Sequence, residues 1–90
     1  MVKYKVVYTK DALKDIPKLK SAHLATKAQN LIKLIKEDPL KNPPPYEKLL
    51  GNLDGLYSRR INIKHRLIYE IISDTKTIKI VSMWSHYETV

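Results

Sequence analysis

The chain has 90 residues, with 17 lysine and arginine side chains against 9 aspartate and glutamate, and so a formal net charge of +8. This length suits a single domain over residues 1–90 with one modest core. The positive charge is typical of a surface that binds nucleic acid or an acidic protein. The alternative is a basic domain that binds neither. The absence of cysteine excludes disulfides and thiolate metal sites, and a charged start and short apolar runs favour a cytoplasmic protein without signal peptide or membrane span.

The chain opens with a stretch that alternates apolar and basic residues. In residues 2–9, VKYKVVYT, valines and tyrosines fall on one face and lysines mostly on the other, which predicts a half-buried strand. Thr9 or Asp11 can cap the helical pattern that follows. Pro17 lacks an N–H group and clashes with the preceding turn, so we expect this first helix to end or kink near residues 16–18.

A second helix is indicated by apolar residues that recur at helical spacing from Leu24 to Ile35. Ser21 would cap this helix, and Asp38 followed by proline would end it. Residues 40–55 then hold three consecutive prolines and the turn sequence GNLDG. We expect this segment to be one long loop, and its length favours a functional role.

Three strand patterns follow, over residues 56–63, 65–73 and 76–85, with turns at Lys64 and at residues 74–75. The element order β-α-α-β-β-β predicts an α+β fold, a mostly antiparallel sheet with both helices packed on one face. Because side chains alternate along a strand, the uncovered face should be part apolar and part cationic. Such a face is suited to binding phosphate.

If the polar residues carry out chemistry, the pattern leaves acid–base chemistry without a metal or cofactor. The histidines show no ligand spacing, the carboxylates are scattered, and the chain has only 2 glycines, too few for a phosphate loop. What remains is Glu47 in the proline-rich loop, Arg60 and Arg66 on neighbouring strands, and His86 with Tyr87 near the end of the chain. Metal-free RNA cleavage needs a base for the ribose 2′-OH, a cation for the charged phosphorus centre and an acid for the departing oxygen.

The same residues also have ordinary structural interpretations. A loop glutamate is usually a solvated charge, strand arginines usually form surface ion pairs, and a terminal His-Tyr is usually a polar tail. We expect His65 at the start of a strand to be structural and His23 to be uninvolved. Trp84 or Tyr87 could stack on a base.

Two spaced motifs and an end pair distinguish this chain. The first is E-x-L-x-x-x-L-x-G-x-Y-S-R-R-I over residues 47–61, the second is H-R-L-I-Y over residues 65–69, and the pair is His86-Tyr87. In these elements and in its element order the chain resembles the YoeB/Txe branch of the RelE-type bacterial toxins over essentially its whole length. The departures are a longer turn at SDTKT and three residues, 88–90, that follow the His-Tyr pair.

The resemblance implies a RelE-like, microbial-RNase-like fold and the toxin of a type II toxin–antitoxin system, a ribosome-dependent endoribonuclease that cuts mRNA in the A site. By position in the motifs, Glu47 would be the general base, Arg66 would stabilise the phosphate charge, His86 would be the general acid, and Tyr87 would orient substrate or support the acid. Further RNA contacts would come from Arg59, Arg60, Lys64 and His65.

The implied partners are a cognate acidic antitoxin similar to YefM or Axe, the ribosome and its mRNA, and a second copy of the chain or an assembly with the antitoxin. No membrane partner is expected. Two other functions stay open at this point: a non-catalytic toxin of the same fold that is directed at DNA gyrase, and a basic RNA-binding module. Glu47, Arg66 and His86 together favour the nuclease, because neither alternative needs an acid–base set.

Overall fold

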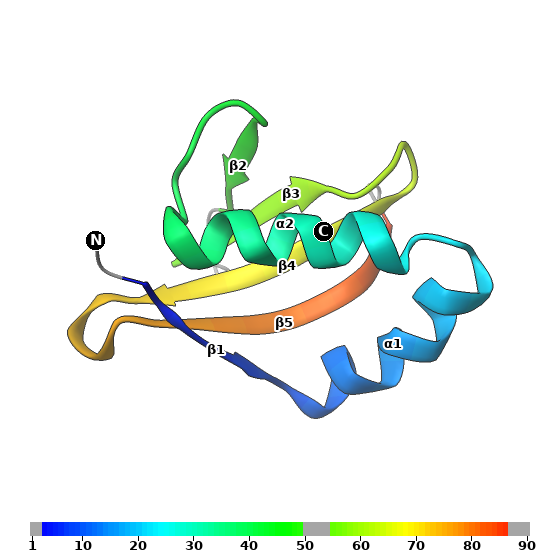
Figure 1. Ribbon diagram of the computed structural model, residues 1–90, viewed down its shortest axis with the longest axis horizontal. Helices are drawn as coiled ribbons and strands as arrows, with labels where there is room; N and C mark the ends of the chain where they lie inside the picture. The colour runs from blue at the N-terminus through cyan, green and yellow to red at the C-terminus, as the bar shows by residue number, and fades with distance from the viewer. Residues whose placement is uncertain (1–2, 50–54, 87–90) are drawn as a thin grey trace.

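The computed structural model describes residues 3–49 and 55–86, and for residues 85 and 86 only the backbone. In this part of the chain, two helices and a short 3₁₀ turn accompany five strands (Figure 1). The elements are β1 (Lys5–Tyr8), α1 (Lys10–Ser21), α2 (Ala25–Glu37), β2 (Tyr46–Lys48), β3 (Leu56–Arg60), β4 (His65–Ile72), η2 (Ser73–Thr75) and β5 (Thr77–His86).

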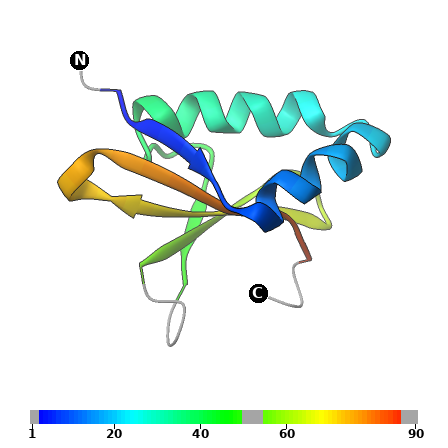
Figure 2. The same ribbon diagram turned by 90° about the horizontal axis from the view of Figure 1, so that it is seen from below.

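The strands form one mixed sheet in the order β1-β5-β4-β3-β2. Only β1 and β5 pair in parallel, and the other neighbours are antiparallel. Both helices lie on the same side of this sheet (Figure 2). The predicted α+β fold, a mostly antiparallel sheet with two helices on one face, is therefore confirmed.

The core lies between the helices and the covered face of the sheet. Burial of these apolar side chains is the main source of stability for a domain of this size. The buried apolar residues are Ala12, Leu19, Leu24, Ala28 and Ile35 from the helical layer and Ile61, Leu67, Tyr69, Ile78, Ile80 and Met83 from the sheet side. Since Leu67 and Tyr69 of β4 face this core, alternation turns Arg66 and Ile68 to the uncovered face.

Helix α1 begins as predicted but does not end where predicted. The Thr9 hydroxyl caps it by accepting a hydrogen bond from the Ala12 N–H at 3.1 Å. The predicted end near residues 16–18 is wrong, because α1 continues through Pro17 to Ser21, whereas the alternative of a kink there stays a prediction. Ala12 and Leu19 are buried on either side of the proline, and this packing outweighs the one hydrogen bond that Pro17 cannot make.

Helix α2 ends at Glu37 and is followed by Asp38 in an extended conformation, as predicted. The predicted Ser21 cap is wrong, since Ser21 is the last residue of α1 and Leu24 precedes α2 without a side-chain cap. His23 takes a positive φ of 60° in the tight connection between the helices.

The segment that was predicted to be one long loop contains strand β2. It pairs antiparallel with β3, so that Glu47 faces Ser58 across the ladder. The sheet thus has one strand more than the pattern predicted, and Glu47 lies on a strand at the edge of the sheet. Strand β3 ends before the predicted residue 63, because the Asn62 side chain accepts hydrogen bonds from the N–H groups of Lys64 at 2.9 Å and His65 at 2.7 Å and forms the turn.

Candidate active site

Three neighbouring strands bring polar side chains together on the uncovered face of the sheet. Glu47 of β2 is the ladder partner of Ser58 on β3, and Arg60 of β3 is the partner of Arg66 on β4. Residues i and i+2 of a strand share a face, so Ser58 and Arg60 point to the same side as Glu47 and Arg66.

Arg66 is a buried cation held in one place by two neighbours. The residue is 5% exposed, and its Nη1 donates to the Ser58 hydroxyl at 3.0 Å and to the Glu47 carboxylate. The Glu47 side chain is 59% exposed, so one member of this ion pair is fixed and the other faces solvent. A buried guanidinium that is already oriented can stabilise a developing negative charge with little reorganisation.

A cleft of about 580 Å³ opens beside this ion pair. Its polar wall carries both signs of charge, and its apolar wall could receive a flat organic group. The cleft is lined by Glu47, Ser58, Arg60, Asn62 and Arg66, and by Pro44, Pro45, Tyr46, Ile61 and Ile63. Three predicted site residues, Glu47, Arg60 and Arg66, therefore share one cavity.

Arg60 and Arg66 lie directly opposite each other in the β3–β4 ladder. Like charges in this arrangement repel, which an anion between them would relieve. A phosphate is such an anion, and arginine recognises it through two parallel hydrogen bonds. Glu47 already pairs with one of the two arginines, and two arginines against one glutamate leave the lining of the cleft with an excess of positive charge, which favours an anionic ligand.

Arg59 does not occupy the position expected of an RNA contact. It is 1% exposed and lies on the helix-covered face, where it donates to the backbone oxygens of Pro44 at 2.7 Å, Lys41 at 2.8 Å and Pro39 at 3.1 Å. Its Nε also donates to the Tyr69 hydroxyl at 3.0 Å. The prediction for Arg59 is corrected: its guanidinium fastens the proline-rich segment that leads into β2.

Tyr69 completes this buried network by donating its hydroxyl proton to the Pro39 oxygen at 2.8 Å. Burial raises the pKa of Tyr69 above 10.0, and the hydrogen bond from Arg59 lowers it in part. The phenol is therefore held in its neutral, donating form. Arg59 and Tyr69 together place the segment that carries Glu47.

Lys64 and His65 do not line the cleft. Lys64 is exposed in the turn between β3 and β4, and His65 is buried, with its ring stacked on Trp84 at a centroid distance of 3.9 Å and an angle of 17°. The structural interpretation of His65 agrees with this position, whereas the predicted RNA contact does not.

The backbone of His86 lies at the end of β5, opposite His65 and next to the Ser85–Arg66 pair. The last described strand thus runs alongside the strand that carries Arg66. Tyr87 lies outside the described residues. Sequence reasoning missed Ser58 as a site residue, although its alternation with Arg60 was a signal that could have found it.

In residues 3–49 and 55–84, whose side chains the structure describes, His, Asp and Glu nowhere gather in a group of three that could hold a metal ion. Over the same residues, neither helix is long and apolar enough to cross a membrane.

Comparison with known sequences identifies related proteins. A family model described as the YoeB-like toxin of bacterial type II toxin–antitoxin systems matches residues 8–87. The toxin YoeB of Synechocystis sp. is 43% identical over 58 residues, 64% of this chain and 65% of that protein. The toxin YoeB of Streptomyces coelicolor is 42% identical over 57 residues, 63% of this chain and 66% of that protein. The chain thus spans just under two thirds of the length of these relatives.

Solved structures match over a larger share of both chains. A YoeB/ParE toxin from Agrobacterium tumefaciens has a TM-score of 0.83 at 27% identity and covers 92% of this chain and 99% of its own. A YoeB dimer from Staphylococcus aureus has a TM-score of 0.80 at 32% identity and covers 96% and 100%. A YoeB–YefM complex from S. aureus matches with a TM-score of 0.78, at the same identity and coverage. Since the family model matches most of its length, the chain belongs to the YoeB-like toxins of bacterial type II toxin–antitoxin systems.

Proposed function

We propose that this protein is a ribosome-dependent endoribonuclease that cuts mRNA in the ribosomal A site and so inhibits translation. The observation that carries the proposal is the contact of the exposed Glu47 carboxylate with the buried Arg66 guanidinium beside a cleft. A solvent-facing carboxylate next to a fixed cation supplies a proton acceptor and a phosphate-binding group in one place. Family membership supports the role of a toxin.

The proposed reaction needs only groups of the chain. Binding of the substrate phosphate to Arg66 and Arg60 replaces the contact between Arg66 and Glu47, which leaves the carboxylate available. Glu47 accepts the proton of the ribose 2′-OH, the 2′-oxygen attacks the adjacent phosphorus, and the bond to the 5′-oxygen breaks. His86 gives its proton to that 5′-oxygen, so the products are a 2′,3′-cyclic phosphate and a 5′-hydroxyl. Tyr87 supports the acid or orients the substrate.

The proposal also includes partners. We expect a cognate acidic antitoxin of the YefM type, because a solved relative is a YoeB–YefM complex and this chain carries a net charge of +8. A homodimer is expected on the precedent of the S. aureus YoeB dimer. The toxin would act in the cytoplasm, where the ribosome and mRNA are.

The proposal is tested by primer extension on mRNA from cells after induction, with Glu47→Gln, Arg66→Ala and His86→Ala compared with the intact protein. Cuts within translated codons should appear with the intact protein and vanish when translation is blocked. Glu47→Gln and His86→Ala should each lower the cleavage rate by roughly 10²–10⁴-fold, the usual contribution of one positioned acid or base. Arg66→Ala should lower it by roughly 10²–10³-fold, the usual contribution of one preorganised charge-stabilising group.

A matched control is Glu37→Gln, which changes an exposed carboxylate at the end of α2, outside the cleft. This variant should cut as the intact protein does. Growth arrest that persists unchanged in both Arg66→Ala and His86→Ala would refute the nuclease and favour a non-catalytic toxin. The variants must still bind the antitoxin, which shows that they are folded.

A further inference from the structure

The ladder between β4 and β5 is irregular just before the end of β5. From Ile72 to Tyr69 the partners step evenly, with Thr77 opposite Ile72 and Ile80 opposite Tyr69. The register then shifts twice, so that Ile68 faces Ser82 and Arg66 faces Ser85. At each shift β5 contributes one residue more than β4 does. Such bulges leave backbone groups without partners in the ladder.

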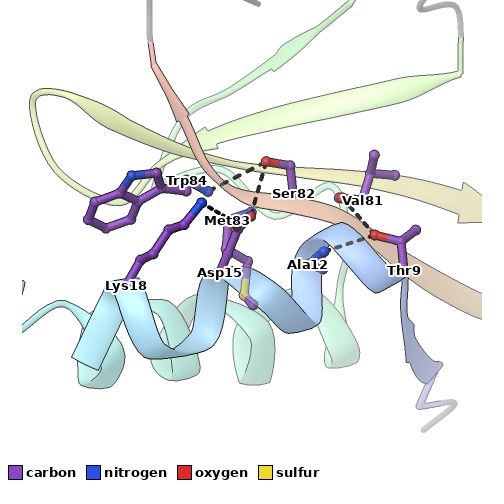
Figure 3. A network of polar contacts seen from close by, with 8 residues as sticks. All are labelled: Thr9, Ala12, Asp15, Lys18, Val81, Ser82, Met83 and Trp84. Carbon is purple, nitrogen blue, oxygen red and sulfur yellow. Dashed lines mark hydrogen bonds and ion pairs between the residues drawn. The ribbon is translucent and has the colours of Figure 1, made fainter. Parts of the chain in front are cut away.

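Helix α1 supplies partners for these backbone groups (Figure 3). The Asp15 carboxylate accepts a hydrogen bond from the Met83 N–H at 3.0 Å, and the Thr9 hydroxyl donates to the Val81 oxygen at 2.8 Å. The Ser82 hydroxyl also reaches Asp15, at 3.5 Å. Helix α1 and its capping residue Thr9 therefore take the place of a neighbouring strand along the bulged part of β5.

Asp15 lies in a position that its charge makes costly. The residue is 6% exposed, on the face of α1 that packs against the sheet, and Lys18 approaches its second oxygen at 3.5 Å. Carboxylates are almost never buried this fully unless they are hydrogen-bonded or paired. The Asp15 carboxylate accepts a hydrogen bond from a backbone N–H group of β5, and this contact ties α1 to one position of that strand.

The bulges determine which residue ends up beside Arg66. If the even register of the Tyr69–Ile72 half continued to the end of the sheet, Trp84 would lie opposite His65, and His86 would fall two residues further on. With the bulges in place, His86 lies opposite His65. The carboxylate of Asp15 is hydrogen-bonded to this stretch of β5, between the even half of the ladder and His86.

We propose that Asp15 is a positioning residue of the active site: outside the cleft, it fixes the β5 bulge that brings His86 to the strand carrying Arg66. The role of His86 as the acid rests on the proposed function, whereas the register of β5 does not. The two parts can therefore fail separately.

The structural part is tested by NMR on the full chain. In the intact protein, a scalar coupling across the hydrogen bond should join the Met83 amide nitrogen to the Asp15 carboxyl carbon, and a cross-strand NOE should join His65 to His86. Asp15→Ala should lose the NOE, while Asp15→Asn, whose side-chain oxygen can still accept from Met83, should keep it. Absence of the coupling in the intact protein would overturn the proposal even if Asp15→Ala failed to fold.

The catalytic part is tested by cleavage of mRNA on programmed ribosomes. Asp15→Ala should lower kcat by on the order of 10²-fold with KM unchanged, because the acid is displaced while the cleft stays intact. Its kcat should also lose the fall with rising pH that a histidine acid produces. Asp15→Asn should restore both the rate and the pH profile.

The matched control is Asp11→Ala, which removes an exposed carboxylate from the first turn of the same helix. It should leave the NOE and kcat unchanged. An NOE that persists in Asp15→Ala, or an NOE that is lost while kcat is retained, would overturn the positioning role. If the intact protein does not cut mRNA, the proposed function fails, and the NMR experiment still decides whether Asp15 sets the register.

Discussion

Arg59 and Arg60 are adjacent in the chain and carry the same side chain, yet the sheet separates their roles. Arg59 is buried under the proline-rich segment and donates to backbone oxygens, whereas Arg60 lines the cleft on the opposite face. Alternation alone predicts that the two point apart. Which of them meets solvent depends on where the segment from Pro39 to Pro44 lies.

Substituting these two arginines should separate stability from activity. Arg59→Met should lower the free energy of unfolding by at least about 3 kcal/mol, because several buried oxygens lose a charged donor at once. Arg60→Met should change it by less than about 0.5 kcal/mol but should weaken mRNA cleavage. Urea denaturation and the cleavage assay measure the two effects, and equal stability of the two variants would contradict the role given to Arg59.

The buried Tyr69 hydroxyl should make the free energy of unfolding depend on pH in the alkaline range. Burial raises its pKa above the ordinary value of 10.0, so the folded protein binds the phenol proton more tightly than the unfolded chain does. The resulting stability is fully present below pH 10 and is lost as pH rises through the raised pKa.

Tyr69→Phe should therefore flatten the fall in unfolding free energy above the ordinary tyrosine pKa, and at neutral pH it should cost about 1 kcal/mol for the lost hydrogen bonds. Urea titrations at neutral and alkaline pH compare the two proteins. Tyr57→Phe, which changes the half-buried tyrosine stacked on Tyr69, is the matched control. The interpretation fails if intact protein and Tyr69→Phe lose stability equally with rising pH.

At the scale of the element, α1 shows how packing overrides a local rule. Pro17 interrupts the hydrogen-bond ladder of the helix, but α1 is anchored on both sides by buried residues and by the contact of Asp15 with β5. The helix therefore persists at a cost that its tertiary contacts offset.

Removing that cost should stabilise the protein. Pro17→Ala should restore the N–H donor and raise the unfolding free energy by roughly 1–3 kcal/mol, the helix-interior penalty of proline less the entropy that proline removes from the unfolded chain. The midpoint of urea denaturation measures the gain. A midpoint at or below that of the intact protein would show that α1 is already relaxed around the proline.

Periodicity was enough to predict most elements but not their connections. The alternation in residues 2–9 and the stripe from Leu24 to Ile35 report directly which faces are buried, so the fold class could be predicted. Strand β2 has only three residues and follows prolines, and it pairs only because β3 offers its edge. The bulged part of β5 contains neither glycine nor proline, so no residue type indicates it in the sequence. The group that contacts it is Asp15 of α1, which lies far away in the sequence.

Some residues of the candidate site could be predicted from the sequence, and others could not. Residue types and their order identified Glu47, Arg60 and Arg66, which the sheet brings to one cleft. Burial could not be read locally, so Arg59 and His65 were assigned to RNA although both are covered. The sequence did not identify Ser58 or Asp15, because the role of each depends on a hydrogen bond to a residue far away in the chain or on another strand.

At the scale of the whole molecule, the net charge of +8 is spread along the chain and should dominate long-range association. We expect the dissociation constant for the proposed acidic antitoxin, measured by titration calorimetry at several salt concentrations, to rise with salt. The dissociation constant should rise mainly because association becomes slower, since electrostatic steering is screened beyond about 8 Å at physiological ionic strength. Association that does not respond to salt would contradict this prediction.

The sheet order also bears on when this protein can become a folded unit. Synthesis proceeds from the N-terminus, but β5, the last described strand, lies between β1 and β4 and carries the core residues Ile78 and Ile80. Until it emerges, β1 lacks the strand it pairs with, and the core under the helices lacks Ile78 and Ile80. A nascent chain therefore cannot complete its core or bring His86 to β4 before β5 has emerged, and the proposed nuclease would be inert towards the ribosome that is making it.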